Sequence, residues 1–266
     1  MIRLRFIYLA GFLLLGGTGC GVNPEYPNAT MGSPTSAVSV SIPTVFLWFP
    51  PTDTPSPEVP ADRLPTPERK PGIGRLLLED GLSSAADWSI AVADQAALAA
   101  TEKGLTIGAQ PGLAPVVGFR QGVIFSDMYA EITARPSLCR GADDYGLVFR
   151  APNDVAYYRF AVACDGTAGA ERISLGGPRM LQSPTPSADV PVGAPGAVRL
   201  GVWAVGSEFR FFLNGRYQFT ASDKSYSSGG IGVFAHAAGD TPVIVAFSDL
   251  SVYDVEATST VETPAP

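Results

Sequence analysis

The residues of this chain that could recognise a ligand are charged and aromatic side chains on strand-like segments. Asp127, Tyr129 and Glu131 alternate along one segment, so they share a face of the predicted strand. Four residues along a strand separate the two carboxylates by ~13 Å, too far for the pair ~5 Å apart that a retaining glycosidase needs. We therefore interpret Tyr129 and Glu131 as part of a polar strip that either holds sugar hydroxyls or simply meets solvent.

Arg150 and Tyr158 are further candidates. Arg150 ends the strand-like segment Tyr145–Arg150 and would lie near Glu131 if the two strands pair antiparallel. Such a cross-strand pair is first a structural device, but it could also hold a sugar hydroxyl. Tyr157 and Tyr158 point to opposite faces, so we expect one to pack and the other to be exposed.

The stretch Val198–Ala221 is predicted to form two successive hairpins, because its apolar residues recur at every second position. The first turn is predicted at Val205–Gly206, which pairs Ala204 with Ser207 and keeps both apolar sets on one face. The residues predicted to share this buried face are Leu200, Val202, Ala204, Phe209, Phe211 and Leu213.

The second turn contains Asn214-Gly215, and both residues tolerate positive φ. A two-residue loop would pair Leu213 with Arg216 and turn Tyr217 and Phe219 away from the core. We expect a three-residue loop with a bulge, which pairs Leu213 with Tyr217 and keeps Tyr217 and Phe219 in the core.

The opposite face of these hairpins carries Trp203, Arg210 and Phe212, together with Arg199 and Gln218. Sugar rings stack on exposed aromatic rings, and neighbouring polar groups would bind their hydroxyls. A covering loop that shields these rings is the alternative. Trp203, Arg210 and Phe212 are therefore candidate ligand-binding residues.

The whole region 72–255 shows many short alternating segments separated by turns every eight to twelve residues, and no helical period. This pattern predicts an all-β domain, a two-sheet antiparallel jelly-roll sandwich. Residues 256–266 are predicted to be a disordered tail.

The N-terminus resembles a bacterial lipoprotein signal. Arg3 and Arg5 precede the apolar run Phe6–Leu15, and Cys20 follows small residues. The run is too short to span a bilayer. The resemblance implies that the signal is cleaved before Cys20 and that Cys20 is lipidated. The protein would then be lipid-anchored at the cell membrane, facing the extracellular or periplasmic side. The alternative is an ordinary cleaved signal.

Residues 21–71 hold 12 of the 24 prolines, mostly next to Thr or Ser, and are predicted to be a disordered, semi-rigid linker. Val38–Phe49 is its one apolar stretch, which could dock on the domain. The two remaining cysteines, Cys139 and Cys164, are expected to form a disulfide, because exported proteins meet oxidising conditions.

The formal net charge is −7, which argues against nucleic acid as a partner. Two cysteines and the single His236 make no metal-ligand cluster, so no metal site or cofactor is expected. A structural Ca²⁺ between Asp80 and Asp249 is the weaker alternative.

The domain resembles the concanavalin A-like lectin/glucanase superfamily, and within it the 3-keto-disaccharide hydrolase-like and laminin-G-like domains. The resemblance is carried by short strand patterns: Trp88, Lys103–Ile107, Tyr145–Arg150, Ala156–Tyr158, Val198–Ala204, Phe211–Gly215, Gly229–Val233 and Phe247–Val252. It implies a jelly roll and a carbohydrate ligand. The glucanases of this superfamily carry Glu-x-Asp-x-x-Glu on one strand, and the chain lacks this motif.

These features predict a cell-surface lipoprotein whose domain binds carbohydrate or another surface ligand, such as a component of the cell envelope, without catalysis. The first alternative is a glycoside or 3-keto-disaccharide hydrolase, and the second is a structural or adhesive module of the envelope. One fold hosts many functions, so the fold alone does not choose between them.

Overall fold

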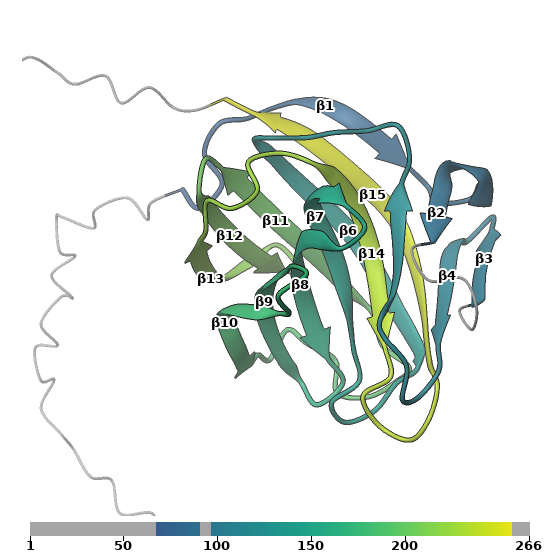
Figure 1. Ribbon diagram of the computed structural model, residues 1–266. Helices are drawn as coiled ribbons and strands as arrows, with labels where there is room; N and C mark the ends of the chain where they lie inside the picture. The colour runs from purple at the N-terminus through teal and green to yellow at the C-terminus, as the bar shows by residue number, and fades with distance from the viewer. Residues whose placement is uncertain (1–67, 91–96, 257–266) are drawn as a thin grey trace, which may run out of the picture. The chain divides into compact units, whose positions relative to one another are not determined.

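The computed structural model describes residues 68–90 and 97–256, and they form two stacked antiparallel sheets (Figure 1). The sole helical element among these residues is the 3-10 turn η1 (Ala85–Asp87). Within them no helix is long and apolar enough to cross a membrane. The predicted all-β, two-sheet jelly-roll sandwich is confirmed. Three predicted segments lie wholly or largely outside the described residues: the signal with Cys20, most of the linker, and nearly all of the tail.

The first sheet, sheet A, contains eight strands, and its central strands come from distant parts of the chain. β6 lies between β11 and β15, and β1 pairs with the last part of β15. In order across the sheet the strands are β13 (Arg216–Ser222), β12 (Glu208–Leu213), β11 (Val198–Val205), β6 (Met128–Leu138), β15 (Val243–Val255), β4 (Gly104–Ala109) and β3 (Ala97–Thr101), with β1 (Ile73–Asp80) beside β15.

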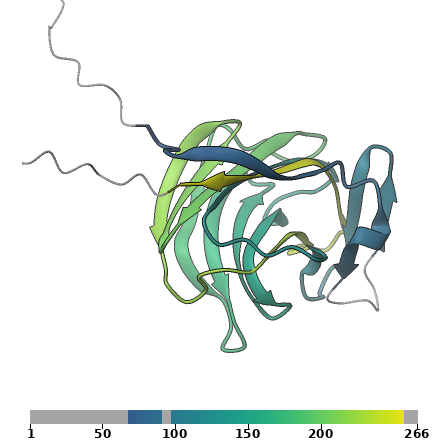
Figure 2. The ribbon, with the colours of Figure 1, turned by 90° about the horizontal axis from the view of Figure 1, so that it is seen from above.

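The second sheet, sheet B, contains seven strands and faces sheet A across the core, as the view from above shows (Figure 2). β7 and β14 are its central pair, although 76 residues separate Asn153 from Gly230 in the chain. In order the strands are β10 (Arg179–Pro186), β9 (Thr167–Ile173), β8 (Ala156–Ala163), β7 (Asp144–Asn153), β14 (Gly230–His236), β5 (Val116–Arg120) and β2 (Trp88–Ile90).

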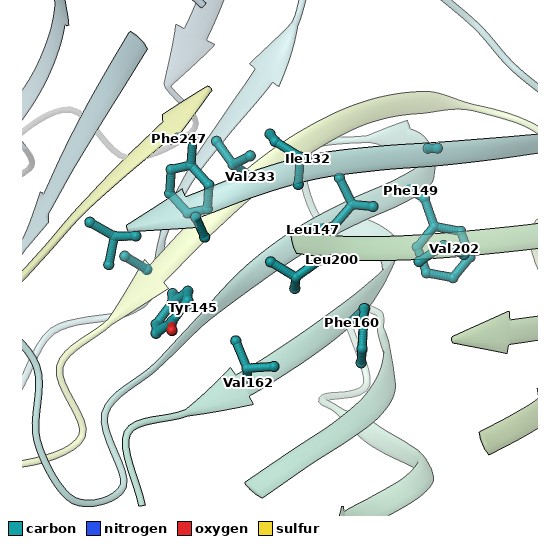
Figure 3. Close-up of a cluster of buried hydrophobic side chains, with 14 of the residues drawn as sticks. Ile132, Tyr145, Leu147, Phe149, Phe160, Val162, Leu200, Val202, Val233 and Phe247 are labelled. Carbon is teal, nitrogen blue, oxygen red and sulfur yellow. The ribbon is translucent and has the colours of Figure 1, made fainter. Parts of the chain in front are cut away.

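The core between the sheets is rich in aromatic side chains that pack edge to face. The Phe149 ring lies 5.2 Å from that of Phe209 and 6.1 Å from that of Phe211, both on the opposite sheet. Phe160 contacts Phe211 at 4.9 Å. Phe149 and Phe160 lie among the branched aliphatic side chains of both sheets (Figure 3). Burying a large apolar side chain stabilises the fold by roughly 2–3 kcal/mol each.

The first hairpin has the predicted faces but a different turn. Val205 pairs with Glu208 and Ala204 with Phe209, so the loop is Gly206–Ser207. The predicted pairing of Ala204 with Ser207 is therefore wrong by two residues. A shift of two residues keeps every side chain on its face, so the predicted apolar set is buried as expected.

The second hairpin corrects the predicted loop. Leu213 pairs with Arg216, and Asn214 and Gly215 have φ of 51° and 78°, the two-residue turn that Asn-Gly favours. Tyr217 therefore lies on the outer face, opposite Phe212. A register shift after Tyr217 then pairs Phe219 with Phe211 and returns Phe219 to the core, as predicted. The bulge is present, but two residues later than expected.

Two strands of the structure were not anticipated in their observed positions. β5 (Val116–Arg120) has no predicted counterpart. β9 spans Thr167–Ile173, and Leu175 beyond its end is 89% exposed. Its sequence, TAGAERI, contains Ala, Gly, Glu and Arg, which favour strands poorly, so its neighbours β8 and β10 must hold it in place.

The predicted disulfide between Cys139 and Cys164 is confirmed, with Cα atoms 5.9 Å apart. Cys139 follows β6 of sheet A and Cys164 follows β8 of sheet B, so the bond links the two layers. Both sulfur atoms are buried at the edge of the core.

Removing this bond should destabilise the domain substantially. The two cysteines are 25 positions apart in the chain, and closing such a loop stabilises the fold by about 3.5 kcal/mol in the chain-entropy model. We expect Cys139→Ala/Cys164→Ala to lower the free energy of unfolding in urea by about that amount. Reduced wild-type protein should show the same loss, and equal stability of the oxidised and reduced forms would contradict it.

Candidate ligand-binding site

A row of charged side chains crosses four neighbouring strands on the outer face of sheet B. It consists of Glu171 on β9, Arg159 on β8, Asp144 on β7 and His236 on β14, and is called the charged row below. Arg159 donates to Glu171 Oε2 through Nε at 2.8 Å and lies 2.7 Å from it through Nη2. His236 Nδ1 lies 2.8 Å from Asp144 Oδ1. One acid–base network therefore spans the middle of the sheet.

The strand period places the charged row on this face. Phe160 and Val162 point into the core, so Arg159 and Ala161 point outward. The strand register then brings the charged residues together in pairs, because Arg159 is the direct partner of Glu171 and Asp144 is the direct partner of His236.

Beside the charged row lies an apolar floor built on the same face. Val148, Tyr157 and Phe234 are buried there, with Phe119 packed edge-on against Tyr157 at 5.9 Å. The Arg159 guanidinium lies 4.8 Å from the Phe234 ring centre, a cation–π contact. Burial raises the pKa of Tyr157, so its hydroxyl stays protonated at neutral pH.

Glycines let these rings lie close to the sheet. A Cβ at Gly146 would collide with the Phe160 carbonyl oxygen and stand 3.1 Å from the Phe234 ring. A Cβ at Gly232 would collide with the Gly118 carbonyl and stand 3.1 Å from Phe119. Side chains at these two positions would displace the aromatic floor.

The charged row opens into a hollow of about 150 Å³. Asp144 and Glu171 line it with small residues between them, and Met180 of β10 forms part of its wall. The lining residues that lack long side chains are Ala142, Ala161, Ala163, Gly169 and Ala170. The carboxylates of Asp144, Asp165 and Glu171 thus line the hollow, and Arg159 lies beside it through its contact with Glu171.

Five of the predicted site residues come together, but on sheet A and under cover. Residues 68–72, called the strap below, lie against the outer faces of Trp203 and Phe212, which are 5% and 1% exposed. Trp203 Nε1 donates to the Pro71 carbonyl at 3.0 Å, and Arg210 donates to the Arg69 carbonyl at 3.1 Å. The Trp203 and Phe212 rings are therefore shielded by a covering segment, which was the predicted alternative to an exposed sugar-binding surface.

Lys70 of the strap contacts the other two of the five. Its Nζ donates to the Tyr129 hydroxyl at 2.9 Å and lies 3.9 Å from Glu131 Oε1. Tyr129 in turn donates to Glu131, which also pairs with Arg199 at 2.7 Å. Burial, followed by the hydrogen bond and charge of Glu131, raises the pKa of Tyr129.

The other two predicted residues, Arg150 and Tyr158, lie elsewhere. Arg150 is on β7 and Glu131 is on β6, in different sheets, so the expected pair is wrong and Arg199 is the partner of Glu131. Arg150 is fully buried, pairs with Asp127 at 3.0 Å and donates to carbonyls of the 126 and 206 loops. Burial lowers the pKa of Arg150, while Asp127 opposes that shift.

Tyr158 is a core residue rather than an exposed one. Its ring lies 4.7 Å from Phe209, and its hydroxyl donates to Asp223 at 2.7 Å. Burial raises its pKa to about 12. Tyr157 is the outward member of the pair, although it too is largely buried.

The two aspartates weighed for calcium are engaged with arginines. Asp80 accepts from Arg120 at 2.6 Å, and Asp249 accepts from Ser248 and lies 4.0 Å from Arg135. Within residues 68–90 and 97–256, no three acidic, His or Cys side chains form a metal-ligand group.

Sequence reasoning missed all four members of the charged row. The alternation of Ala156–Ala163 places Arg159 on the outer face, and that signal could have been read. His236 ends β14 and pairs with Asp144, which lies 92 positions earlier in the chain. Glu171 could not be placed, because the strand that carries it was not recognised.

The strap should stabilise sheet A and exclude solvent from Trp203. Lys70→Ala removes one hydrogen bond and cation–π contacts with Tyr129 and Phe212, so we expect a loss of ~1–2 kcal/mol in the free energy of unfolding. Acrylamide should quench Trp203 fluorescence more strongly, measured in a Trp48→Phe/Trp88→Phe background that leaves Trp203 as the single tryptophan. Lys103→Ala, in an exposed turn, is the matched control; equal quenching in both variants would refute the shielding role.

Tyr158 should make the domain sensitive to alkali. Because its folded pKa is raised to about 12, the folded state keeps a proton that the unfolded chain releases above pH ~10. Stability is then lost as pH rises, by ~2 kcal/mol between pH 10 and 12 for this residue. Urea unfolding across that range should show a smaller decline in Tyr158→Phe than in the wild type. An identical decline in both would contradict the assignment.

Comparisons with known proteins identify the fold and not the family. No protein-family model matches the chain. No curated protein matches it in sequence.

Solved structures do match. A carbohydrate-binding module, CBM66 from Bacillus subtilis, is 17% identical with a TM-score of 0.53, over 63% of this chain and 96% of that one. The catalytic domain of an endo-1,3-β-glucanase (laminarinase) from Thermotoga petrophila is 12% identical with a TM-score of 0.51, over 69% and 98%. A B. subtilis protein of unknown function with a galectin-like fold is 16% identical with a TM-score of 0.50, over 70% and 99%. The described domain therefore has the jelly-roll fold of such proteins.

Proposed function

We propose that the domain binds carbohydrate without catalysis, and that the charged row is the binding site. One geometric feature carries the proposal. Arg159 Nη1 lies 3.9 Å from Asp144 Oδ2, which is too long for a hydrogen bond. A ligand hydroxyl between them could accept from the guanidinium and donate to the carboxylate.

A second acceptor faces the same hollow. Both contacts of Arg159 with Glu171 use Oε2, and among the described residues Oε1 of Glu171 accepts no hydrogen bond. Among the described residues this oxygen is not sealed from solvent, so it can accept a hydrogen bond from water or from a ligand hydroxyl. The hydroxyls of a sugar supply donors for carboxylate acceptors such as these.

The arrangement favours binding over hydrolysis. Asp144 and Glu171 line one hollow, as the paired carboxylates of a glycosidase would. The guanidinium of Arg159 contacts Glu171 and reaches towards Asp144, so it lies where a scissile bond between two catalytic carboxyls would need room. The solved structures with this fold include both a carbohydrate-binding module and a glucanase catalytic domain.

The proposed setting is a lipid-anchored protein outside the cell. The basic, apolar and small residues of 1–20 with Cys20 support it, and the linker would hold the domain away from the membrane. The disulfide between Cys139 and Cys164 is consistent with an oxidising compartment. Metabolic labelling with a fatty acid, abolished by Cys20→Ala, would test the anchor.

Substitutions in the charged row should weaken binding while the fold persists. We expect Arg159→Lys, which keeps the charge but loses the two-pronged contact, and Glu171→Gln each to weaken binding of a glycan-array hit at least tenfold. The matched controls Arg199→Lys and Glu131→Gln alter the equivalent ion pair on the outer face of sheet A and should leave affinity unchanged.

Three outcomes would decide against the proposal. A well-folded protein that binds no sugar on the array would favour the structural or adhesive alternative, as would equal losses in row and control variants. Turnover of glycosides or 3-keto-glycosides that disappears in Asp144→Asn would instead establish a hydrolase.

A further inference from the structure

Two arginines stand directly opposite each other at one end of sheet B. Arg179 on β10 is the Cα partner of Arg172 on β9. Like charges in this position repel, which destabilises the strand pair. Both arginines line a hollow of about 340 Å³ together with Lys224, and the remaining lining residues are Ser207, Ser222, Asp223 and Ser225. This cavity is called the cationic hollow below.

One of the three cations is already neutralised. Arg172 Nη1 donates to Asp223 Oδ2 at 3.0 Å and to Ser225 Oγ. Asp223 also accepts from the Tyr158 hydroxyl at 2.7 Å and the Ser225 amide at 2.8 Å. Burial alone would raise the pKa of Asp223, but these hydrogen bonds and the charge of Arg172 together lower it. Asp223 and Arg172 are thus a fixed, charge-neutral pair.

The other two cations have no such partner. Among the described residues, neither Arg179 nor Lys224 forms an ion pair. The cationic hollow therefore carries two uncompensated positive charges, although the whole chain has a net charge of −7. Arg179 and Lys224 are exposed and line the hollow together with three serines, so an anionic group could pair with both cations.

A second hollow adjoins the first. It measures about 280 Å³ and shares Ser207 and Lys224 with the cationic hollow. Its other lining residues are Ser126, Asp127, Gly206, Tyr226 and Ser227. Asp127 is paired with Arg150 beneath it, so its charge is balanced. The joint space thus offers cations at one end and polar side chains at the other.

We propose that the cationic hollow binds the carboxylate or sulfate of an acidic saccharide, and that the adjoining hollow holds the rest of that sugar ring. Arg179 and Lys224 contact the anionic group, and Arg172, held by Asp223, completes its surroundings. The assignment to a saccharide rests on the proposed function, whereas the anion site does not. The hollow shares no residue with the charged row, so the two sites can be tested separately.

The test is calorimetric titration of the full chain at low ionic strength, where exposed charges are least screened. The probes are inorganic sulfate, glucuronate and glucose. We expect glucuronate, sulfate or both to bind, glucose not to bind this site, and Arg179→Gln and Lys224→Gln each to weaken anion binding at least fivefold. Arg75→Gln, which removes an exposed arginine from β1, is the matched control and should bind like the wild type.

The outcomes separate the two proposals. Loss of anion binding in Arg179→Gln with retained array binding in the same variant supports the inference and leaves the charged row intact. Anion binding that persists when no array sugar binds refutes the proposed function but leaves the anion site. Absence of binding by both anions, or equal weakening in Arg179→Gln and Arg75→Gln, overturns the inference. Thermal unfolding of each variant excludes loss of fold as the cause.

Discussion

The aromatic contact between the two sheets is the constraint on which the rest of the structure depends. Phe149 and Phe160 of sheet B meet Phe209 and Phe211 of sheet A, and a slip of one residue in any of these strands would reverse both of its faces. Once the inner faces are fixed, the identity of every outward side chain follows from strand period and register. The charged row and the aromatic face under the strap are both consequences of that packing.

The two outer faces then differ in how their charges are satisfied. On sheet A, Glu131 accepts from Tyr129, pairs with Arg199 and lies near Lys70, so its hydrogen-bonding capacity is largely used within the protein. On sheet B, Arg159 and Asp144 stand 3.9 Å apart beside an open hollow. Carboxylate and arginine side chains thus stabilise the protein on the outer face of sheet A. On the outer face of sheet B, part of their hydrogen-bonding capacity remains available to the proposed ligand.

Sequence reasoning reached as far as local pattern extends. Alternation identified the buried faces of the central hairpins, and compartment arguments identified the Cys139–Cys164 bond. Sequence reasoning did not locate the bulge of the second hairpin. The bulge follows Tyr217 because Phe219 packs against Phe211, and this contact cannot be read from the local pattern. Sequence reasoning also failed for Glu171, because β9 has little strand propensity of its own and is held by β8 and β10. The candidate site therefore needed long-range register, which no local pattern contains.

The fold alone does not distinguish a binding module from a glycosidase, since both occur among its structural neighbours. The difference must come from the groups between the carboxylates. A hydrolase needs the space between its two carboxyl groups for the scissile bond and, in inverting enzymes, for a water molecule. In this protein an arginine that is 12% exposed contacts Glu171 and approaches Asp144 from that space. Its charge would also oppose the positive charge that develops on the sugar in the transition state, whereas it would strengthen hydrogen bonds to a ground-state hydroxyl. The electrostatics of the charged row thus favour the proposed binding of a sugar over its cleavage.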